Sequence, residues 1–503
     1  MIRTHGTQRG SKTALFVEDE KISYAKLLDR VNAFAGYLST KGIKQGDRVA
    51  LFLRNSPEFL ITLFALSKLG AVAVPINTFL KSEELSYILE DSGAMMLVAS
   101  AIYEPIVKGS DVEDLCDLVI WKGEIEQPDS FNVRFKDTLE AKLEATEVKR
   151  TLEDMAVIIY TSGTTGKPKG AMLSYKNIFS NCEAGMERIG VNSKDRGIVF
   201  LPMFHSFTLS IGIILMMYVG GSIVIIKSLQ PFSNIFKQTL TKRVTLFLGI
   251  PDVYNALSKA KLPWYFMWFN NLRAFVSGAA ALQEHTLIAM GQKFTKAILV
   301  EGYGLSEASP AICINPLEKP KAKSVGPAMY GYDVKIVDES MRELPRGEVG
   351  DIIASGDNIM MGYLGKPEAT AEVIINGWLL TGDMGYMDEE GYLYIVDRKK
   401  DLIISKGINI YPREIEEILD AINGVKASAV VGIPDEKSGE IPIAYIELEE
   451  SVDSIDESEM RAYLREHLAN YKIPKAIHLI KELPKNATGK VLKRVLKENL
   501  KAQ

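Results

Sequence analysis

The sequence contains few of the residues that build disulfide frameworks or metal-ligand clusters. Only three of its 503 residues are cysteines and only five are histidines. Because Cys116, Cys182 and Cys313 are odd in number and far apart, they predict neither disulfide bonds nor a metal site. Scattered cysteines are typical of a reducing compartment, so we expect a cytoplasmic protein.

The chain also lacks a strong excess of either charge. Its 59 lysine and arginine residues nearly balance 64 aspartate and glutamate residues, for a formal net charge of -5. Because this balance provides no basic surface that would gather nucleic acid, we expect no nucleic-acid partner. Residues 1–12 lack the apolar core of a signal peptide, so secretion is not expected either.

Uncharged runs long enough to cross a bilayer are scarce, but residues 207–226 call for a check because they contain no charged side chain. Gly220 and Gly221 divide this run into two parts. The pattern predicts a buried helix up to Tyr218 and a buried strand over residues 221–226, and therefore no transmembrane segment.

The general composition is that of a globular protein, with 47% apolar and 24% charged residues. A chain of this length exceeds one hydrophobic core, so two or more domains are expected. Short β-branched runs alternate with helical segments, which predicts parallel sheets covered by helices, an α/β body. The predicted strands are residues 48–53, 71–76, 156–160, 222–227, 245–249, 273–277 and 297–301. Helices are predicted over residues 24–41 and 83–91, the second with Ser82 as its N-cap.

The pattern changes in the last third of the chain. From Gly347 the sequence is typical of strands and turns, up to a charged cluster at residues 397–401. Beyond the cluster we predict two helices and two strands, the content of a small α+β domain. These elements are residues 413–421, 427–431, 443–448 and 457–468, with Pro412 in the first turn of the first helix.

The strongest local motif is the segment YTSGTTGKPKG at residues 160–170, directly after a predicted buried strand. Its glycines let backbone N–H groups turn inward, its hydroxyls add donors, and its lysines add positive charge, which suits a polyphosphate. The spacing differs from that of a Walker loop. The candidate phosphate-binding residues are Thr161, Ser162, Gly163, Thr164, Thr165, Gly166, Lys167 and Lys169.

This loop resembles the phosphate-binding signature of the adenylate-forming superfamily, which includes acyl-CoA synthetases, luciferases and the adenylation domains of peptide synthetases. Further motifs of that superfamily follow in its order, so the resemblance spans nearly the whole chain. It implies two domains, residues 1–397 for AMP and acyl binding and residues 398–503 as a mobile domain with a hinge near Lys400. It also implies ATP, Mg²⁺ and coenzyme A as the small molecules bound.

Two motifs resemble those around the adenine and the phosphates in this superfamily. The segment SGAA resembles the adenine-pocket lining, with candidates Gly278, Ala279 and Ala280. The segment EGYGLSE resembles the next motif, in which Tyr303 would lie on adenine, Ser306 would reach the α-phosphate and Glu307 would hold magnesium. Glu301, Gly302 and Gly304 complete its set of cofactor-binding candidates. Thr165 and Glu307 are also candidates for a catalytic role.

Three later motifs complete the resemblance. Asp383, in Thr-Gly-Asp, would accept hydrogen bonds from both ribose hydroxyls, and Arg398 would contact the ribose or a phosphate. Lys490, in PKNATGK, would stabilise the charge that develops during adenylation. Lys406 and Gly407 lie on a loop that would face the site during thiol attack, where glycine lets the backbone approach a narrow pantetheine chain.

The substrate is indicated by the segment LPMFHSF at residues 201–207, which resembles the acyl-pocket motif. It lacks the aspartate with which amino-acid-activating domains bind an ammonium group, and the chain ends soon after Lys490. The resemblance is greatest to medium- or long-chain fatty acid–CoA ligases. Aryl-acid CoA ligases, ligases that donate to a carrier protein, and a non-catalytic adenylate-binding protein remain alternatives.

Some features leave two interpretations open. His205 could gate the acyl pocket or pack as a core histidine, and the apolar residues 209–217 could line the pocket or form a plain core helix. The aromatic run at residues 262–269 could form a lid, make a weak peripheral membrane contact, or begin a packed helix. Monomer and homodimer are both compatible with the sequence.

Overall fold

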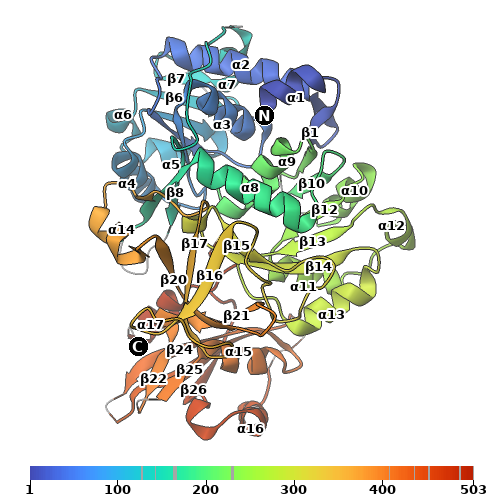
Figure 1. Cartoon of the computed structure of the whole chain (residues 1–503), viewed down its shortest axis with the longest axis vertical. Coiled ribbons are helices and arrows are strands. Elements are labelled where there is room, and N and C mark those ends of the chain that lie inside the picture. Colours follow the sequence, from blue (N-terminus) through green and yellow to red (C-terminus); the bar gives the residue numbers. More distant parts are fainter. Residues whose placement is uncertain are drawn as a thin grey trace. The chain divides into compact units, whose positions relative to one another are not determined.

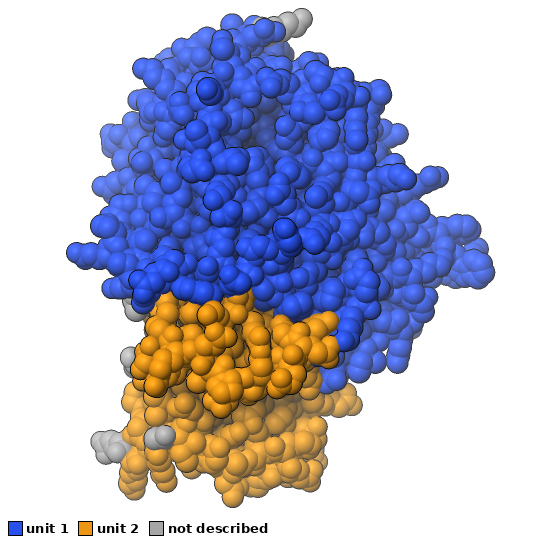
Figure 2. Space-filling view, in the orientation of Figure 1, with its two compact units in different colours: residues 1–322, 326–333, 354–379 blue, residues 323–325, 334–353, 380–503 orange. Residues whose placement is uncertain are grey.

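The computed structural model describes residues 1–125, 128–141, 143–161, 167–227, 232–406, 408–435, 437–450, 452, 454–486 and 489–501. Close packing divides the chain into two compact units, coloured separately in Figure 2. Unit 1 comprises residues 1–322, 326–333 and 354–379, and unit 2 comprises residues 323–325, 334–353 and 380–503.

The first sheet of unit 1 has eight strands, and its central pairs are parallel. Its buried aromatic and aliphatic side chains form one continuous core, in which Phe247 and Phe275 pack on Tyr254. In order across the sheet the strands are β15 (Ala311–Ile314), β14 (Ile298–Gly304), β13 (Ala274–Ser277), β12 (Leu246–Gly249), β10 (Arg196–Val199), β11 (Ser222–Ile225), β1 (Thr13–Val17) and β2 (Glu20–Ser23).

The second sheet of unit 1 also has eight strands and combines a parallel part with an antiparallel hairpin. The hairpin β8–β9 carries the predicted phosphate loop between its strands. In order across the sheet the strands are β18 (Gly362–Tyr363), β9 (Lys169–Ser174), β8 (Met155–Thr161), β4 (Val72–Pro75), β3 (Arg48–Phe52), β5 (Met96–Ser100), β6 (Leu118–Lys122) and β7 (Asn132–Arg134).

Helices cover both sheets of unit 1 (Figure 1). The long α8 (Tyr175–Ile189) contacts β9 of one sheet and β15 of the other, so it lies where the two sheets approach each other. The remaining helices are α1 (Ile2–Gln8), α2 (Tyr24–Thr40), α3 (Pro57–Leu69), α4 (Ser82–Ser92), α5 (Glu104–Lys108), α6 (Val112–Leu115), α7 (Phe135–Glu140), α9 (Leu215–Tyr218), α10 (Ser233–Thr241), α11 (Pro251–Lys259), α12 (Trp264–Phe269), α13 (Glu284–Lys293) and α14 (Pro367–Val373).

Unit 2 contains most of a five-stranded sheet and all residues from Leu380 to the C-terminus. The five-stranded sheet has the order β16 (Tyr332–Val337), β17 (Gly350–Gly356), β20 (Trp378–Met387) and β19 (Ile374–Ile375), with β21 (Leu393–Arg398) beside β20. The C-terminal sheet has the order β23 (Ile408–Ile410), β22 (Ile403–Ser405), β25 (Gly439–Leu448) and β24 (Val425–Asp435), with β26 (Ala476–Ile480) beside β25. Its helices are α15 (Pro412–Asp420), α16 (Glu457–His467) and α17 (Lys493–Lys501).

The predicted fold class is confirmed: a large part with helix-covered sheets is followed by a smaller α+β part. All seven predicted strands of the large part are present as β3, β4, β8, β11, β12, β13 and β14. The uncharged run at residues 207–226 is indeed a buried helix followed by a buried strand, in which a π-helical stretch, Thr208–Ile214, continues into α9. Among the described residues, no helix is long and apolar enough to cross a membrane.

The N-cap predicted for α4 is wrong by one residue. Lys81 occupies the N-cap position, and its N–H donates to the Glu84 carboxylate at 2.9 Å. Ser82 is the first helical residue, and its hydroxyl donates to the Ile106 carbonyl at 2.9 Å. The Ser82 hydroxyl therefore bonds to a carbonyl distant in the sequence and does not form the helix cap that the local pattern predicted.

The predicted domain boundary at residue 397 concerns motion, and it stays a prediction. Packing alone groups β21 and most of β20 with the C-terminal part, because unit 2 begins its long final segment at Leu380. A boundary defined by packing and a hinge defined by rotation need not coincide.

Candidate active site

Three of the candidate segments begin where parallel strands of one sheet end. His205 follows β10, Gly278 follows β13, and Glu307 follows β14. Because β10, β12, β13 and β14 are mutually parallel neighbours, their carboxyl ends lie on one edge of the sheet. Ligands of open α/β sheets bind at that edge, so the segments are brought to a typical ligand position.

The carboxylate of Glu307 is held by hydroxyl groups from two other segments of unit 1. Its Oε1 accepts a hydrogen bond from Thr161 Oγ1 at 3.2 Å and from the Tyr363 hydroxyl at 3.0 Å. Its backbone carbonyl accepts from the Met360 N–H at 2.9 Å. A carboxylate offers about four lone-pair positions, so two hydroxyl donors leave it able to bind a cation.

The two lysines of the phosphate loop both lie near tyrosine rings. Lys169 is the cross-strand partner of Thr161 on the β8–β9 hairpin, and its Nζ lies 5.2 Å from the centre of the Tyr363 ring. Lys167 Nζ lies 4.7 Å from the centre of the Tyr87 ring. These cation–π contacts keep both ammonium groups beside the hairpin. Ser162, Gly163, Thr164, Thr165 and Gly166 lie outside the described residues.

A polar network fixes the base of the same hairpin. Asp91 on α4 accepts hydrogen bonds from Tyr160 at 2.7 Å and from Lys366 at 2.6 Å. Tyr87 on α4 donates to the Pro168 carbonyl at 3.0 Å. Burial, together with the bond to Asp91, raises the pKa of Tyr160, so this phenol stays a donor at neutral pH. The end of β8 and the start of β9 are therefore both tied to α4.

The segments after β13 and β14 are held by backbone contacts. Glu301 Oε1 accepts from the Leu282 N–H at 2.9 Å, so this candidate ties the end of the Gly278–Ala280 segment to β14. Ala279 has φ of 71°, a conformation that non-glycine residues adopt at a cost of about 1–3 kcal/mol. A Cβ on Gly304 would lie 1.9 Å from the Pro310 carbonyl oxygen, so only glycine fits there.

The acyl-pocket motif is linked directly to the Glu307 motif. The hydroxyls of Ser206 and Ser306 lie 3.0 Å apart, and the Phe207 ring lies in van der Waals reach of a Cβ built on Gly278. His205 Nδ1 accepts a hydrogen bond from the Phe207 N–H at 3.3 Å, which leaves the proton on Nε2. Burial lowers the pKa of His205 to about 4, so its imidazole is neutral at pH 7.

In unit 2, Asp383 and Arg398 are cross-strand partners on β20 and β21. Arg398 Nε lies 3.3 Å from Asp383 Oδ1, and the Asp383 side chain is almost fully buried. The Asp383 N–H donates to Thr381 Oγ1 at 3.2 Å, and Thr381 in turn donates to the Ile352 carbonyl at 2.8 Å. The strand pairing thus brings together Asp383, which sequence analysis assigned to the ribose, and Arg398, which it assigned to the ribose or a phosphate.

The candidate lysine also lies in this group. Burial, and after it the positive charge of Arg398, lower the pKa of Lys490 to about 7, although the Asp383 carboxylate acts in the opposite direction. Burial and Arg398 lower the pKa of Lys400 as well. The backbone around Lys490 is fixed by Asn486, whose N–H donates to the Lys490 carbonyl and whose side chain accepts the Lys490 N–H, each at 2.9 Å.

The predicted hinge is bridged by hydrogen bonds within unit 2. The Asp397 carboxylate accepts the Arg398 N–H at 2.7 Å and the Arg413 N–H at 2.9 Å. Arg413 also donates from Nη1 to the Ile395 carbonyl at 2.9 Å. Lys406 lies elsewhere, at the exposed turn between β22 and β23, with φ of 51°. Gly407 lies outside the described residues.

Sequence reasoning missed Tyr363 and Asp91. Tyr363 belongs to a two-residue strand beside β9 and lies nearly 60 residues beyond Glu307 in the chain, so no local motif connects the two. Asp91 lies in the last turn of α4, a helix whose sequence pattern indicates only packing. A glycine on each side of the Tyr-Leu pair at residues 363–364 was the one local sign of an unusual backbone.

Comparison with known families and proteins agrees with this arrangement. The family model described as "AMP-binding enzyme" matches residues 2–364, and the model described as "AMP-binding enzyme C-terminal domain" matches residues 414–490. A feruloyl-CoA synthase from an Amycolatopsis species is 36% identical over 94% of this chain and 92% of its own length. A long-chain-fatty-acid–CoA ligase from Bacillus subtilis is 35% identical over 97% of this chain and 91% of its own.

A solved structure extends the similarity to the arrangement of the chain. The crystal structure of ATP-bound MatB from Rhodopseudomonas palustris superposes with a TM-score of 0.89 at 32% identity, covering 98% of this chain and 96% of that one.

Proposed function

The chain belongs to the AMP-binding enzyme family, in the acyl-CoA synthetase branch of the adenylate-forming superfamily, and from this premise we propose that it is an ATP-dependent fatty acid–CoA ligase. The general activity, adenylation of an acid followed by thioester formation, is that of the branch. The choice of a medium- or long-chain fatty acid as the acid is specific to this proposal.

The reaction has two steps. In the first, a carboxylate oxygen of the acid bonds to the α-phosphorus of ATP, and the bond to the β-phosphate bridging oxygen breaks, which releases pyrophosphate. In the second, the sulfur of coenzyme A bonds to the acyl carbon, and the acyl–oxygen bond to AMP breaks. The thiol proton is lost to solvent or a base, so the products are acyl-CoA and AMP.

A magnesium ion fits the residues around Glu307. Magnesium bound with a nucleotide takes one or two carboxylates plus phosphate oxygens and waters, so a full cage of protein ligands is not needed. The Glu307 carboxylate, oriented by Thr161 and Tyr363, supplies one such oxygen. When bound there, the ion would neutralise phosphate charge during the first step.

The remaining residues have roles that follow from their chemistry. Lys167 and Lys169 supply positive charge beside the phosphate loop, and the hydroxyl pair Ser206–Ser306 lies between the acyl and phosphate motifs. In unit 2, Asp383 offers a buried carboxylate to the ribose, and Lys490 offers a compact cation to the departing pyrophosphate. Lys406 lies on a different turn, which suits a separate role in the second step.

The observation that supports a fatty acid is the absence of charge in the acyl segment. Residues 201–217 contain no aspartate, glutamate, lysine or arginine, and His205 is neutral because burial lowers its pKa to about 4. An amino acid would bring an ammonium group that this segment cannot pair, at a high cost in desolvation. The buried Leu, Ile and Met side chains that follow suit an alkyl chain.

An aryl acid is the second candidate, and a specific observation favours it. The Phe207 ring beside Gly278 would provide a flat surface for an aromatic ring, and the feruloyl-CoA synthase is among the most similar relatives. Transfer to a carrier protein is an alternative for the second step, and adenylate binding without turnover is an alternative to the whole reaction.

Acid-dependent AMP release tests the proposal. The protein would be incubated with ATP, Mg²⁺ and coenzyme A against a panel of fatty, aryl and amino acids, with pyrophosphate exchange measured in parallel without coenzyme A. We expect the highest rate with a medium- or long-chain fatty acid. The highest rate with an aryl or amino acid would refute the fatty-acid assignment, and exchange without AMP release would indicate a different thiol acceptor.

A further inference from the structure

A short helix of unit 1 exposes an unusual number of aromatic side chains. On the six-residue α12, Trp264, Trp268 and Phe269 are 70%, 71% and 64% exposed, and Tyr265 is 47% exposed. Only Phe266 is buried, where it packs edge-on against Phe236 at 5.5 Å between ring centres. The helix is therefore anchored by one ring and presents the others to its surroundings.

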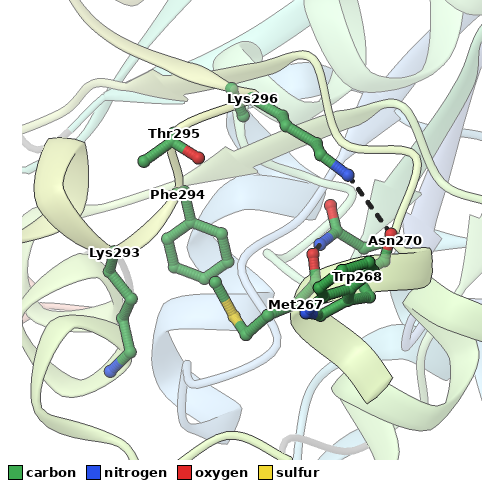
Figure 3. A pocket seen from close by; sticks show the side chains of 8 residues that line it. Met267, Trp268, Asn270, Lys293, Phe294, Thr295 and Lys296 are labelled. Atoms are coloured by element: carbon green, nitrogen blue, oxygen red, sulfur yellow. Dashed lines mark hydrogen bonds between the residues drawn. The ribbon is translucent and has the colours of Figure 1, made fainter. Parts of the chain in front are cut away.

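Polar groups hold the C-terminal end of α12. Asn270 donates from Nδ2 to the carbonyls of Phe266 at 2.9 Å and Met267 at 3.1 Å. Lys296 Nζ donates to the Trp268 carbonyl at 3.2 Å (Figure 3). These bonds satisfy carbonyls that a helix C-terminus leaves without partners. The exposed aromatics thus stand on a fixed backbone.

A pocket of about 340 Å³ lies beside α12. Figure 3 shows Met267, Trp268 and Phe294 on the apolar part of its lining, with the ammonium group of Lys296 close to the helix end. The surface is therefore apolar in the middle and positively charged at its margin.

The sequence around α12 carries almost no negative charge. Between residues 253 and 300 the only acidic residue is Glu284, whereas five residues are basic, namely Lys259, Lys261, Arg273, Lys293 and Lys296. Arg273 is used inside the protein, where it forms an ion pair with the buried Asp195 at 2.8 Å. Lys259, Lys261 and Lys296 are exposed. Exposed aromatics next to exposed lysines form what we call the α12 surface.

We propose that the α12 surface binds anionic lipid bilayers, with its aromatic rings in the headgroup region and its lysines on lipid phosphates and carboxylates. Tryptophan and tyrosine prefer the membrane interface, because the ring is apolar and the N–H or O–H stays hydrated. Each lysine near an anionic bilayer contributes about fivefold to partitioning. The proposal concerns location and does not depend on which acid the enzyme activates.

A second copy of the chain is a poorer occupant of this surface. Two α12 surfaces facing each other would bring Lys261 and Lys296 of both copies into a desolvated contact with few acidic residues to pair them. Lysine is also depleted at the centres of protein interfaces. An anionic bilayer supplies the missing negative charge.

Vesicle binding tests the proposal with the full-length protein. Sedimentation would be measured with vesicles of phosphatidylserine mixed with phosphatidylcholine and with vesicles of phosphatidylcholine alone. We expect binding to the first that weakens as salt is raised, and little binding to the second. Trp264 and Trp268 are two of the four tryptophans, so binding should shift the protein fluorescence to shorter wavelength.

Two variants separate the rings from the charges. Trp264→Ser with Trp268→Ser should lower vesicle partitioning at least tenfold, and Lys261→Glu should lower it severalfold. Phe79→Ser is the matched control, because Phe79 is 68% exposed and lies outside the α12 surface. All three variants should keep the thermal midpoint and the rate with a water-soluble short acid, since none of these side chains belongs to the site.

Several results would overturn the proposal. These are no binding of the wild type to anionic vesicles, equal binding to neutral vesicles, or a double tryptophan variant that binds as the wild type does. A concentration-dependent dimer that the double variant loses, without vesicle binding, would assign the surface to a second copy instead.

Discussion

The two units present their charged groups in opposite ways. In unit 1, the Glu307 carboxylate is held by neutral hydroxyls of Thr161 and Tyr363. In unit 2, Asp383 is paired with the cation Arg398. Burial and the charge of the same arginine lower the pKa of Lys490, so its positive charge is less stable there. Neutral donors orient a carboxylate without cancelling its charge, whereas a cationic partner cancels it.

This difference leaves the charge of the Glu307 carboxylate uncompensated by its two hydroxyl donors, whereas the Asp383 carboxylate is paired with a cation. The proposed magnesium role of Glu307 depends on the first arrangement. The group in unit 2 contains charges of both signs that can re-pair when a charged ligand arrives. Substitutions in one unit at a time test this comparison, and the largest effect is expected from the first.

The largest effect is expected in unit 2. Lys490→Ala should lower adenylation by about 10²- to 10³-fold, the scale for losing one electrostatic contact in a transition state. Conversion of preformed acyl-adenylate to acyl-CoA should stay nearly intact, because the phosphate chemistry is already complete. Pyrophosphate exchange and thioester formation would be measured separately.

Two further variants serve as a control and as a test of the hinge. Lys481→Ala, an exposed lysine before the same loop, should leave both steps unchanged. Lys400→Pro should impair the second step more than the first, since fixing φ restricts rotation at the predicted hinge. Equal losses in both steps for Lys490→Ala and Lys400→Pro would contradict a rotating domain.

A smaller effect is expected at Asp383. A carboxylate that accepts charge-assisted hydrogen bonds contributes about 1.5–3 kcal/mol, so Asp383→Ala should weaken ATP use by roughly 10- to 150-fold. The variant should also discriminate less against deoxyATP than the wild type does. The control is Glu389→Ala, an exposed acid on the turn after β20. Nucleotide kinetics like those of the wild type would remove Asp383 from the site.

On the side of unit 1, Tyr363→Phe removes one of the two hydroxyls that orient Glu307. A neutral hydrogen bond contributes about 0.5–1.5 kcal/mol, so the Mg²⁺ concentration at half-maximal rate should rise about two- to twelvefold. Tyr386→Phe is the matched control, because Tyr386 stacks on Tyr394 in unit 2. An unchanged magnesium dependence would show that Tyr363 does not act through Glu307.

The smallest effect concerns pH. An ammonium with a pKa of about 7 is charged below that pH and loses its charge as pH rises. If the first step needs charged Lys490, kcat/KM for adenylation should fall about fivefold from pH 7 to pH 8. Lys490→Arg should move this fall to higher pH, because arginine stays charged. The same fall in Lys490→Arg would assign it to another group.

The sequence predicted those parts of the site whose functional residues lie within one short, contiguous motif. Glu307 and Asp383 both stand in recognisable motifs. Glu307 follows the end of the parallel strand β14, whereas Asp383 lies within β20. The structure brings Thr161 close to Glu307 and Asp383 close to Arg398, although their functional roles stay predictions.

The parts that could not be predicted depend on contacts between distant segments. Tyr363 reaches Glu307 only because β18 adds to the edge of β9, and a two-residue strand has no periodicity to detect. Asp91 reaches Tyr160 across 69 positions of the chain. The exposure of α12 was equally hidden, since an aromatic run is compatible with a buried helix until its packing is known.

The two hydrogen bonds that Arg413 donates to Asp397 and Ile395 hold the two sides of the predicted hinge together. Asp397 and Ile395 precede Lys400, and Arg413 follows it, so a rotation at Lys400 must break both contacts. At about 1 kcal/mol each, two such bonds favour the bonded orientation by roughly 30-fold. A ligand that turns the domain must therefore supply at least that difference through contacts made only after the turn.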